Sequence, residues 1–326
     1  MANFENIYNL EKIKSFHDSA NRMMKEVVPF TDNLGGGLIA PEALVHVEKR
    51  IYKKQFPDLV LLQTGIRVNN EGSYNRFIRS LRTATEGGFA YADEVASDKG
   101  VLTLSGETSI MEVAEKGIRT FWTDSQVKEL ALQGVNCANE HVAGVLKKYQ
   151  EDIDEIGLIG DKRVEGLLNS SVYTTSAASK TVENLNGLEL YQEIAEFINE
   201  QWTGVNNIMA YMGNVCLVPI DFMNKAMTEL LPADTAGNSV RVKTVWSCLT
   251  DNFPTVKFMA SEKCTRTRKA LLMSTSDEAL QLRIPVPLEV GEVVRTGSFE
   301  YKTDYKYRIA GCDILQKDSG HILTGL

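Results

Sequence analysis

Residues 124 to about 150 constrain the fold most, because they predict one long amphipathic helix. At about 1.5 Å per residue, that helix would be roughly 40 Å long. Thr123 and Gln126 fit a capping box at its start. Gly134 and Gly144 have low helix propensity and make an unbroken helix less favourable, but they would allow close packing against a sheet. The apolar residues that recur at the spacing of one helix face are Val127, Leu130, Val135, Ala138, Val142, Val145, Leu146 and Tyr149.

The chain has enough apolar residues for real cores, since 43% of its 326 residues are hydrophobic. Its formal charge of −8 argues against a broad basic face that grips nucleic-acid phosphates. The first residues lack the pattern of a signal peptide, and no apolar run approaches about 18 residues, so we expect a cytosol-like compartment and no membrane partner. The five cysteines are widely spaced, never form CxxC and are expected to be reduced.

Residues 64–100 form a long polar stretch that cannot build a core alone, since turn signals are frequent and large aliphatic residues are few. Basic residues dominate its first part, against Glu71: Arg67, Arg76, Arg79 and Arg82. Acidic residues dominate its second part, against Lys99: Glu86, Asp93, Glu94 and Asp98. The stretch is either a solvated hairpin or an extended flap whose charges meet a neighbouring subunit.

The sequence QEDIDEIGLIG, at 150–160, suggests a metal site because it is rich in carboxylates: Glu151, Asp152, Asp154 and Glu155. A calcium loop that started at Asp152 would need an oxygen ligand at its fifth position and a Glu at its twelfth. Ile156 and Arg163 occupy those positions, so the template fails. We therefore expect no metal here. The apolar residues of the stretch are expected to be buried while its carboxylates face water or basic groups, within or between subunits.

Other chemical signatures are missing from the sequence. It contains no phosphate-binding GxxxxGK[ST] loop, HExxH pair, GxSxG elbow or GxGxxG turn, and its four histidines lie far apart. We therefore expect no cofactor and no enzyme activity. One alternative from another class stays open, a soluble hydrolase that uses the carboxylates at 151–155 with a divalent metal.

From residue 185 the pattern changes to that of a compact α/β unit. Asn186 can cap a helix at 187–202, and Pro285 and Pro287 restrict the alternating segment 280–290 to an edge or a bulge. Further strands are expected at 207–220, 239–246, 255–260, 269–274 and 299–315, a helix at 221–231, and a short apolar tail at 321–326.

The order of these parts resembles the major capsid proteins of tailed bacteriophages with the Hong Kong 97 fold. The resemblance rests on LGGGLIAPEAL at 34–44, on the acidic stretch before GLLN at 166–169, and on a Y-x-x-R-x-x-G motif formed by Tyr305, Arg308 and Gly311. It covers most of residues 35–326. QKDSGH, at 316–321, departs from the family pattern.

The resemblance implies an α+β subunit with five parts. They are an N-terminal arm (1–40), a peripheral domain with a spine helix near 124–150 (41–63 and 101–184), an extended loop (64–100), an axial domain (185–275), and return strands of the peripheral domain with a C-terminal tail (276–326). It also implies self-assembly into hexamers and pentamers of an icosahedral phage head in the virion, built in the host cytoplasm.

The implied partners are other copies of the chain, portal, scaffold and decoration proteins, and double-stranded DNA that is enclosed without sequence-specific binding. An encapsulin-like nanocompartment shell is the near alternative. The candidates for contacts between subunits are Arg67, Arg76, Arg79, Arg82, Glu86, Asp93, Glu94, Glu151, Asp152, Asp154 and Glu155.

Overall fold

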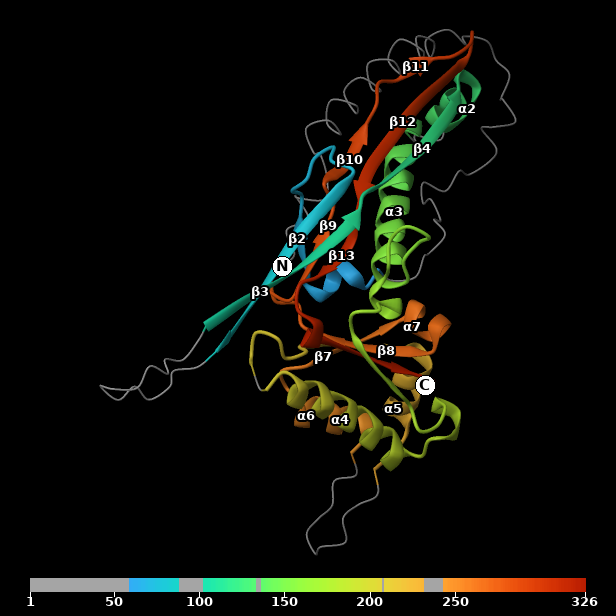
Figure 1. Cartoon of the computed structure of the whole chain (residues 1–326). Helices are drawn as coiled ribbons and strands as arrows, with labels where there is room; N and C mark the ends of the chain where they lie inside the picture. Colours follow the sequence, from blue (N-terminus) through green and yellow to red (C-terminus); the bar gives the residue numbers. More distant parts are fainter. Residues whose placement is uncertain (1–58, 88–101, 133–135, 207, 232–242) are drawn as a thin grey trace, which may run out of the picture.

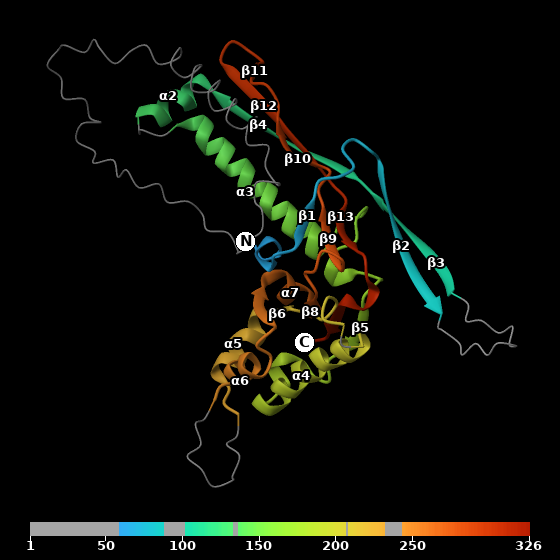
Figure 2. The ribbon, with the colours of Figure 1, turned by 90° about the vertical axis from the view of Figure 1, so that its left-hand side faces the viewer.

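The computed structural model describes residues 59–87, 102–132, 136–206, 208–231 and 243–326, and the fold is given for these. They form an elongated body in which helix α3 runs beside a long antiparallel sheet (Figure 1). A second sheet with its own helices lies at one end of α3, and a β-ribbon projects from the side of the body (Figure 2). The arm expected at 1–40 lies outside the described residues.

The expected spine is two helices, α2 (Asp124–Leu132) and α3 (Cys137–Leu158). The predicted capping box is confirmed, because the Thr123 hydroxyl accepts the N–H of Gln126 at 3.3 Å and the Gln126 side chain accepts the N–H of Thr123 at 3.0 Å. The expectation of a single helix ending near residue 150 is wrong. A second cap, the Asn136 side chain, accepts the N–H of Asn139 and starts α3 anew.

The long sheet packs one face on α3. Its strands are β4 (Ala114–Thr123), β10 (Val286–Val290), β11 (Val294–Arg295) and β12 (Glu300–Ile309), and β12 pairs antiparallel with the other three. Tyr307 of β12 meets Tyr149 of α3 edge to face, with ring centroids 4.7 Å apart. Pro287 lies in β10, an edge strand whose register shifts between Val286 and Glu289, as the two prolines predicted.

A small sheet and the ribbon lie beside the long sheet. The small sheet has the order β1 (Arg67–Asn69), β9 (Leu280–Arg283), β13 (Gly311–Ile314). The ribbon pairs β2 (Phe77–Gly87) with β3 (Leu102–Glu112) antiparallel. The polar stretch expected at 64–100 therefore corresponds in its described part to β1 and to a ribbon that extends to Glu112.

The second sheet has five strands in the order β5-β14-β8-β6-β7. Their bounds are β5 (Thr174–Ala177), β6 (Val215–Pro219), β7 (Lys257–Ser261), β8 (Lys269–Met273) and β14 (Gly320–Thr324). The C-terminal segment expected to form a tail is thus an inner strand, β14, which pairs with both β5 and β8. The boundaries proposed for an axial domain, 185–275, leave out two strands of this sheet.

Helices α4 (Gly187–Gly204), α5 (Ile220–Thr228), α6 (Val245–Asn252) and α7 (Glu262–Thr267) accompany the second sheet. The cap at Asn186 is confirmed as a full capping box with Glu189. The strand expected at 239–246 is wrong where the structure describes it. The Thr244 hydroxyl accepts the N–H of Ser247 at 3.2 Å and starts α6, whose Val245 and Leu249 are fully buried.

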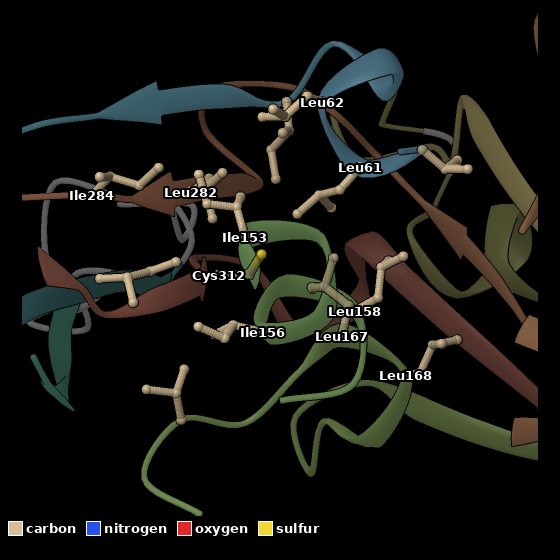
Figure 3. Close-up of a cluster of buried hydrophobic side chains, with 14 of the residues drawn as sticks. Leu61, Leu62, Ile153, Ile156, Leu158, Leu167, Leu168, Leu282, Ile284 and Cys312 are labelled. Atoms are coloured by element: carbon tan, nitrogen blue, oxygen red, sulfur yellow. The ribbon is translucent and has the colours of Figure 1, made fainter. Parts of the chain in front are cut away.

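The five-stranded sheet is apolar on both faces, because alternate residues of its strands enter two cores. Cys216 and Leu272 pack with α4, α5 and α6, whereas Leu217 and Leu271 pack with the C-terminal half of α3. Figure 3 shows the second of these cores, where side chains of α3, of the 3₁₀ turn η3 (Leu61–Thr64) and of β9 point toward one another. The remaining short turns are η4 (Leu167–Asn169), η5 (Val182–Asn184) and η6 (Lys317–Ser319).

Candidate functional site at the acidic end of α3

The four carboxylates of the QEDIDEIGLIG stretch lie within α3, in its last two turns. The stretch is therefore part of the helix and does not follow it, as the expected end near residue 150 implied, since α3 continues through Leu158. The predicted burial of its apolar side is confirmed for Ile153, Ile156 and Leu158, which are at most 2% exposed. The carboxylates project on other sides of the helix, and each has a partner within the chain.

Asp154 is buried, contrary to the expectation that it faces water or a basic group; its residue is 2% exposed. Its Oδ1 accepts the backbone N–H groups of Val60 at 3.0 Å and Leu61 at 2.8 Å. Burial raises the pKa of Asp154, while these two N–H groups and the charge of Lys263 oppose the rise. Asp154 therefore joins α3 to the start of η3.

Glu155 joins α3 to α7. Its two carboxylate oxygens form ion pairs with Lys263 and Arg266, which lie on α7. Burial on its own raises the pKa of Glu155, but the hydrogen bonds and charges of the two basic residues outweigh it, so the pKa lies below its usual value. These two ion pairs link α3, which packs on the long sheet, to α7, which accompanies the five-stranded sheet.

Asp152 joins α3 to the long sheet. It accepts a hydrogen bond from Lys116 Nζ of β4 at 3.0 Å and one from the hydroxyl of Tyr307 in β12. Burial and the neighbouring Asp152 carboxylate both raise the pKa of Tyr307, so the phenol stays protonated and donates. Glu151, the fourth carboxylate, pairs with Lys148 one turn earlier at 2.6 Å.

A cavity of about 650 Å³ adjoins these carboxylates, between α3, the long sheet and the start of α7. Ile118, Val145 and Leu288 contribute apolar walls, and Glu262 stands at the α7 side. The hollow is thus lined by both apolar and charged side chains.

A second polar cluster anchors the base of the ribbon. The Ser80 hydroxyl of β2 donates to Oδ2 of Asp313 at 2.6 Å, and Arg283 forms an ion pair with the same oxygen at 3.2 Å. Asp313 is 1% exposed. The face of the ribbon that carries Ser80 is therefore attached to β9 and β13 of its own subunit.

The predicted contact residues of the polar stretch are not brought together. Arg67 pairs with Asp277 at 2.6 Å, Arg76 is exposed, and Arg79 donates to the Thr108 hydroxyl at 3.1 Å. Arg82 and Glu86 lie in β2, but their side chains are outside the described part, and Asp93 and Glu94 lie outside it altogether. Their expected role between subunits stays a prediction, as it does for the carboxylates of α3.

The Y-x-x-R-x-x-G motif has a structural explanation. Tyr305 is 2% exposed in the core between β12 and α3. Arg308 lies 3.6 Å from a Glu115 carboxylate oxygen and donates to the carbonyl of Ser73. Gly311 has φ +86°, and a β-carbon there would meet Val164, so the position favours glycine.

The partners of the carboxylates were not predicted from the sequence: Lys116, Lys263, Arg266, Tyr307 and the backbone of Val60 and Leu61. They lie between 36 and 155 residues away along the chain, so no local spacing points to them. Among the residues that the structure describes, no group of three or more His, Cys, Asp or Glu side chains could hold a metal ion. Within the same residues, no helix has the length and apolar character needed to cross a membrane.

Comparison with known proteins gives a family and several similar structures. A family model described as major capsid protein matches residues 96–325. The capsid of Myoviridae phage XM1 is 33% identical, with a TM-score of 0.73 over 89% of this chain and 100% of that one. The comparison with curated proteins gives no match.

More distant structures share the fold alone. A chain from Mycobacterium phage Adephagia has a TM-score of 0.60 at 11% identity, over 89% of this chain and 99% of that one. The capsid of a native GTA particle has a TM-score of 0.62 at 10% identity, over 90% of this chain and 100% of that one.

Proposed function

The chain belongs to the major capsid protein family, and from this we propose that its copies form hexamers and pentamers that close an icosahedral phage head around double-stranded DNA. It is a phage shell protein with an α+β fold of the Hong Kong 97 type, and the resemblance found in the sequence is confirmed. The observation that carries the proposal is the 33% identity to a phage capsid chain over that chain's full length. An encapsulin-like shell is not favoured.

We assign the long sheet with α2 and α3 to a peripheral domain, and the five-stranded sheet with α4, α5 and α6 to an axial domain that stands near capsomer centres. The ribbon is the base of the extended loop. Glu155 supports this assignment physically, because its ion pairs with Lys263 and Arg266 tie α3 to α7, which lies between strands β7 and β8 of the five-stranded sheet. If the connection between the two domains is rigid, a contact made by one domain also fixes the orientation of the other domain within a capsomer.

The protein's place is the virion capsid, and we propose that assembly takes place in the host cytoplasm with portal, scaffold and decoration proteins. The DNA would be enclosed without sequence-specific binding. A formal charge of −8 supports this, because a container for packed DNA does not need to adhere to it.

Sedimentation velocity of the purified full chain tests the proposal. We expect wild-type protein to form fast-sedimenting particles of one size. Reversing Arg76 and Arg79 to Glu should shift the protein to small species while its far-UV circular dichroism stays unchanged, because these arginines are proposed to meet acidic surface on another subunit. Normal particles from the double variant would refute that pairing but leave the shell function standing.

A further inference from the structure

We propose that Tyr74 is a positioning residue for shell assembly, which clamps the base of the β2–β3 ribbon to the long sheet and thereby fixes the direction in which the ribbon projects. This inference rests on the proposed function, because a fixed direction matters when identical copies have to fit together. Three features of the molecule carry it: the contacts of Tyr74, the strained backbone beside it, and a second attachment of the same ribbon.

Tyr74 lies on the turn that joins β1 to β2, beside β10 and β12 of the long sheet (Figures 1 and 2). Its hydroxyl donates to the Glu289 carboxylate of β10, with both oxygens at 3.2 Å. Lys306 Nζ and Arg308 Cζ of β12 lie 5.5 and 5.7 Å from the centre of its ring, within the range of a cation–π contact. We call these four side chains the Tyr74 clamp. An aromatic side chain that is 61% exposed is therefore fixed by polar contacts rather than by burial.

The backbone next to the clamp is strained. Ser73 has φ +41°, a left-handed conformation that is unfavourable for a residue with a β-carbon. Arg308 Nη1 donates to the Ser73 carbonyl at 3.3 Å, so the same side chain holds both the backbone of the turn and the ring of Tyr74. Strained conformations persist where the surrounding structure imposes them, and they cluster at functional positions. The turn is thus held in one defined conformation.

The ribbon is attached a second time at Ser80, six positions after Tyr74, through the hydrogen bond to the buried Asp313 of β13. Tyr74 contacts the long sheet and Ser80 contacts the small sheet, so the two attachments together fix the direction of β2. With Ser80 alone, the ribbon could swing about that point. Gly87, the last residue of β2, lies seven positions beyond Ser80, so a swing of about 15° would move it by roughly 6 Å.

A displacement of this size matters in a shell, because symmetry repeats each contact from copy to copy and the same deviation recurs at every one of them. A ribbon that already has its working direction also loses less conformational freedom when it meets another copy. The Tyr74 clamp therefore selects the direction from which the ribbon can engage another copy, and with it the curvature of the shell.

The distance between two spin labels tests the clamp in the full chain, at a concentration too low for assembly. The labels are attached at Thr85→Cys in β2 and at Ala143→Cys, an exposed position of α3, with the half-buried Cys248 replaced by Ser. Tyr74→Ala should at least double the width of the distance distribution. Tyr74→Phe keeps the ring over both cations and should stay near the original width. The control Phe299→Ala removes an aromatic side chain of similar exposure, 66%, next to the other end of β12, and should leave the width unchanged.

Electron microscopy of the unlabelled variants, at an assembling concentration, tests the consequence. Tyr74→Phe and Phe299→Ala should form particles of one diameter, as the wild type does, whereas Tyr74→Ala should form particles of several diameters. Thermal unfolding verifies that each variant is folded, and Lys306→Met, which removes one of the two cations, replaces Tyr74→Ala if that variant unfolds.

Unchanged distances in Tyr74→Ala, or equal broadening in Phe299→Ala, would overturn the clamp. Uniform particles from a Tyr74→Ala chain with broadened distances would overturn its role in assembly. A wild-type chain that forms no particles would overturn the shell function itself, while the distances would still decide whether the clamp fixes the ribbon.

Discussion

Replacing Asp154 by Ala should destabilise the subunit strongly, because this carboxylate is buried and holds backbone groups of another element. Its carboxylate accepts two backbone N–H groups, from Val60 at 3.0 Å and from Leu61 at 2.8 Å, in a site where it is 2% exposed. Hydrogen bonds to a charged acceptor contribute about 1.5–3 kcal/mol each, and the substitution also leaves two buried donors unsatisfied.

The cost of burying the charge offsets part of this gain, as the raised pKa of Asp154 indicates. We therefore expect Asp154→Ala to lower the free energy of unfolding by about 3 kcal/mol rather than by the full sum of two such bonds. Asp154→Asn keeps the shape and a carbonyl acceptor, so its loss should be smaller. Asp304→Ala is the exposed control, because that carboxylate lies on the open face of β12 and pairs with the exposed Arg119.

The assay is urea unfolding of the full chain, at a concentration too low for assembly, followed by far-UV circular dichroism. The predicted order of stability is wild type, Asp304→Ala, Asp154→Asn, Asp154→Ala, with the first two close together. If Asp154→Ala unfolded at the same urea concentration as Asp304→Ala, Asp154 would not be the joint between α3 and η3.

Glu155→Gln should weaken the joint between α3 and α7 by about 1 kcal/mol or less, because the ion pairs are partly screened by solvent. Since the folded-state pKa of Glu155 is lowered, its contribution should be present above the unfolded value of 4.5 and disappear as the pH falls through the lower folded value. Urea midpoints of wild type and Glu155→Gln should thus converge in acid, and a constant gap would contradict the pairing. Gly311→Ala should cost more than Gly65→Ala in the same assay. Both glycines have positive φ, worth roughly 1–2 kcal/mol, but only at Gly311 would the new methyl group meet a side chain. Equal losses would show that Val164 moves aside.

The sequence predicted the elements whose signals are local. The capping box at Thr123, the cap at Asn186 and the bulged edge strand at Pro287 all depend on residues within a few positions of each other. The helical periodicity correctly predicted which face of the spine is apolar. It wrongly predicted one continuous helix. A cap such as Asn136 inside a periodic pattern carries little signal, because Asn also occurs within helices.

Long-range partners could not be predicted in this way. Glu155 finds Arg266 only because α7 folds back onto the end of α3, 111 residues later in the chain. The C-terminal strand β14 looks like a tail in the sequence, since its neighbours β5 and β8 are distant and differ in direction relative to it. Val245 and Leu249 sit in a β-branched, aromatic context that suggests a strand, and the cap at Thr244 decides for a helix instead.

Electron microscopy of the purified protein shows whether copies of this chain build a closed shell. We expect hollow particles of uniform diameter whose averaged images show icosahedral symmetry, with capsomers of six and five subunits. Protein that remains monomeric at every concentration and salt condition tested, or that forms only open sheets without five-fold vertices, would contradict it.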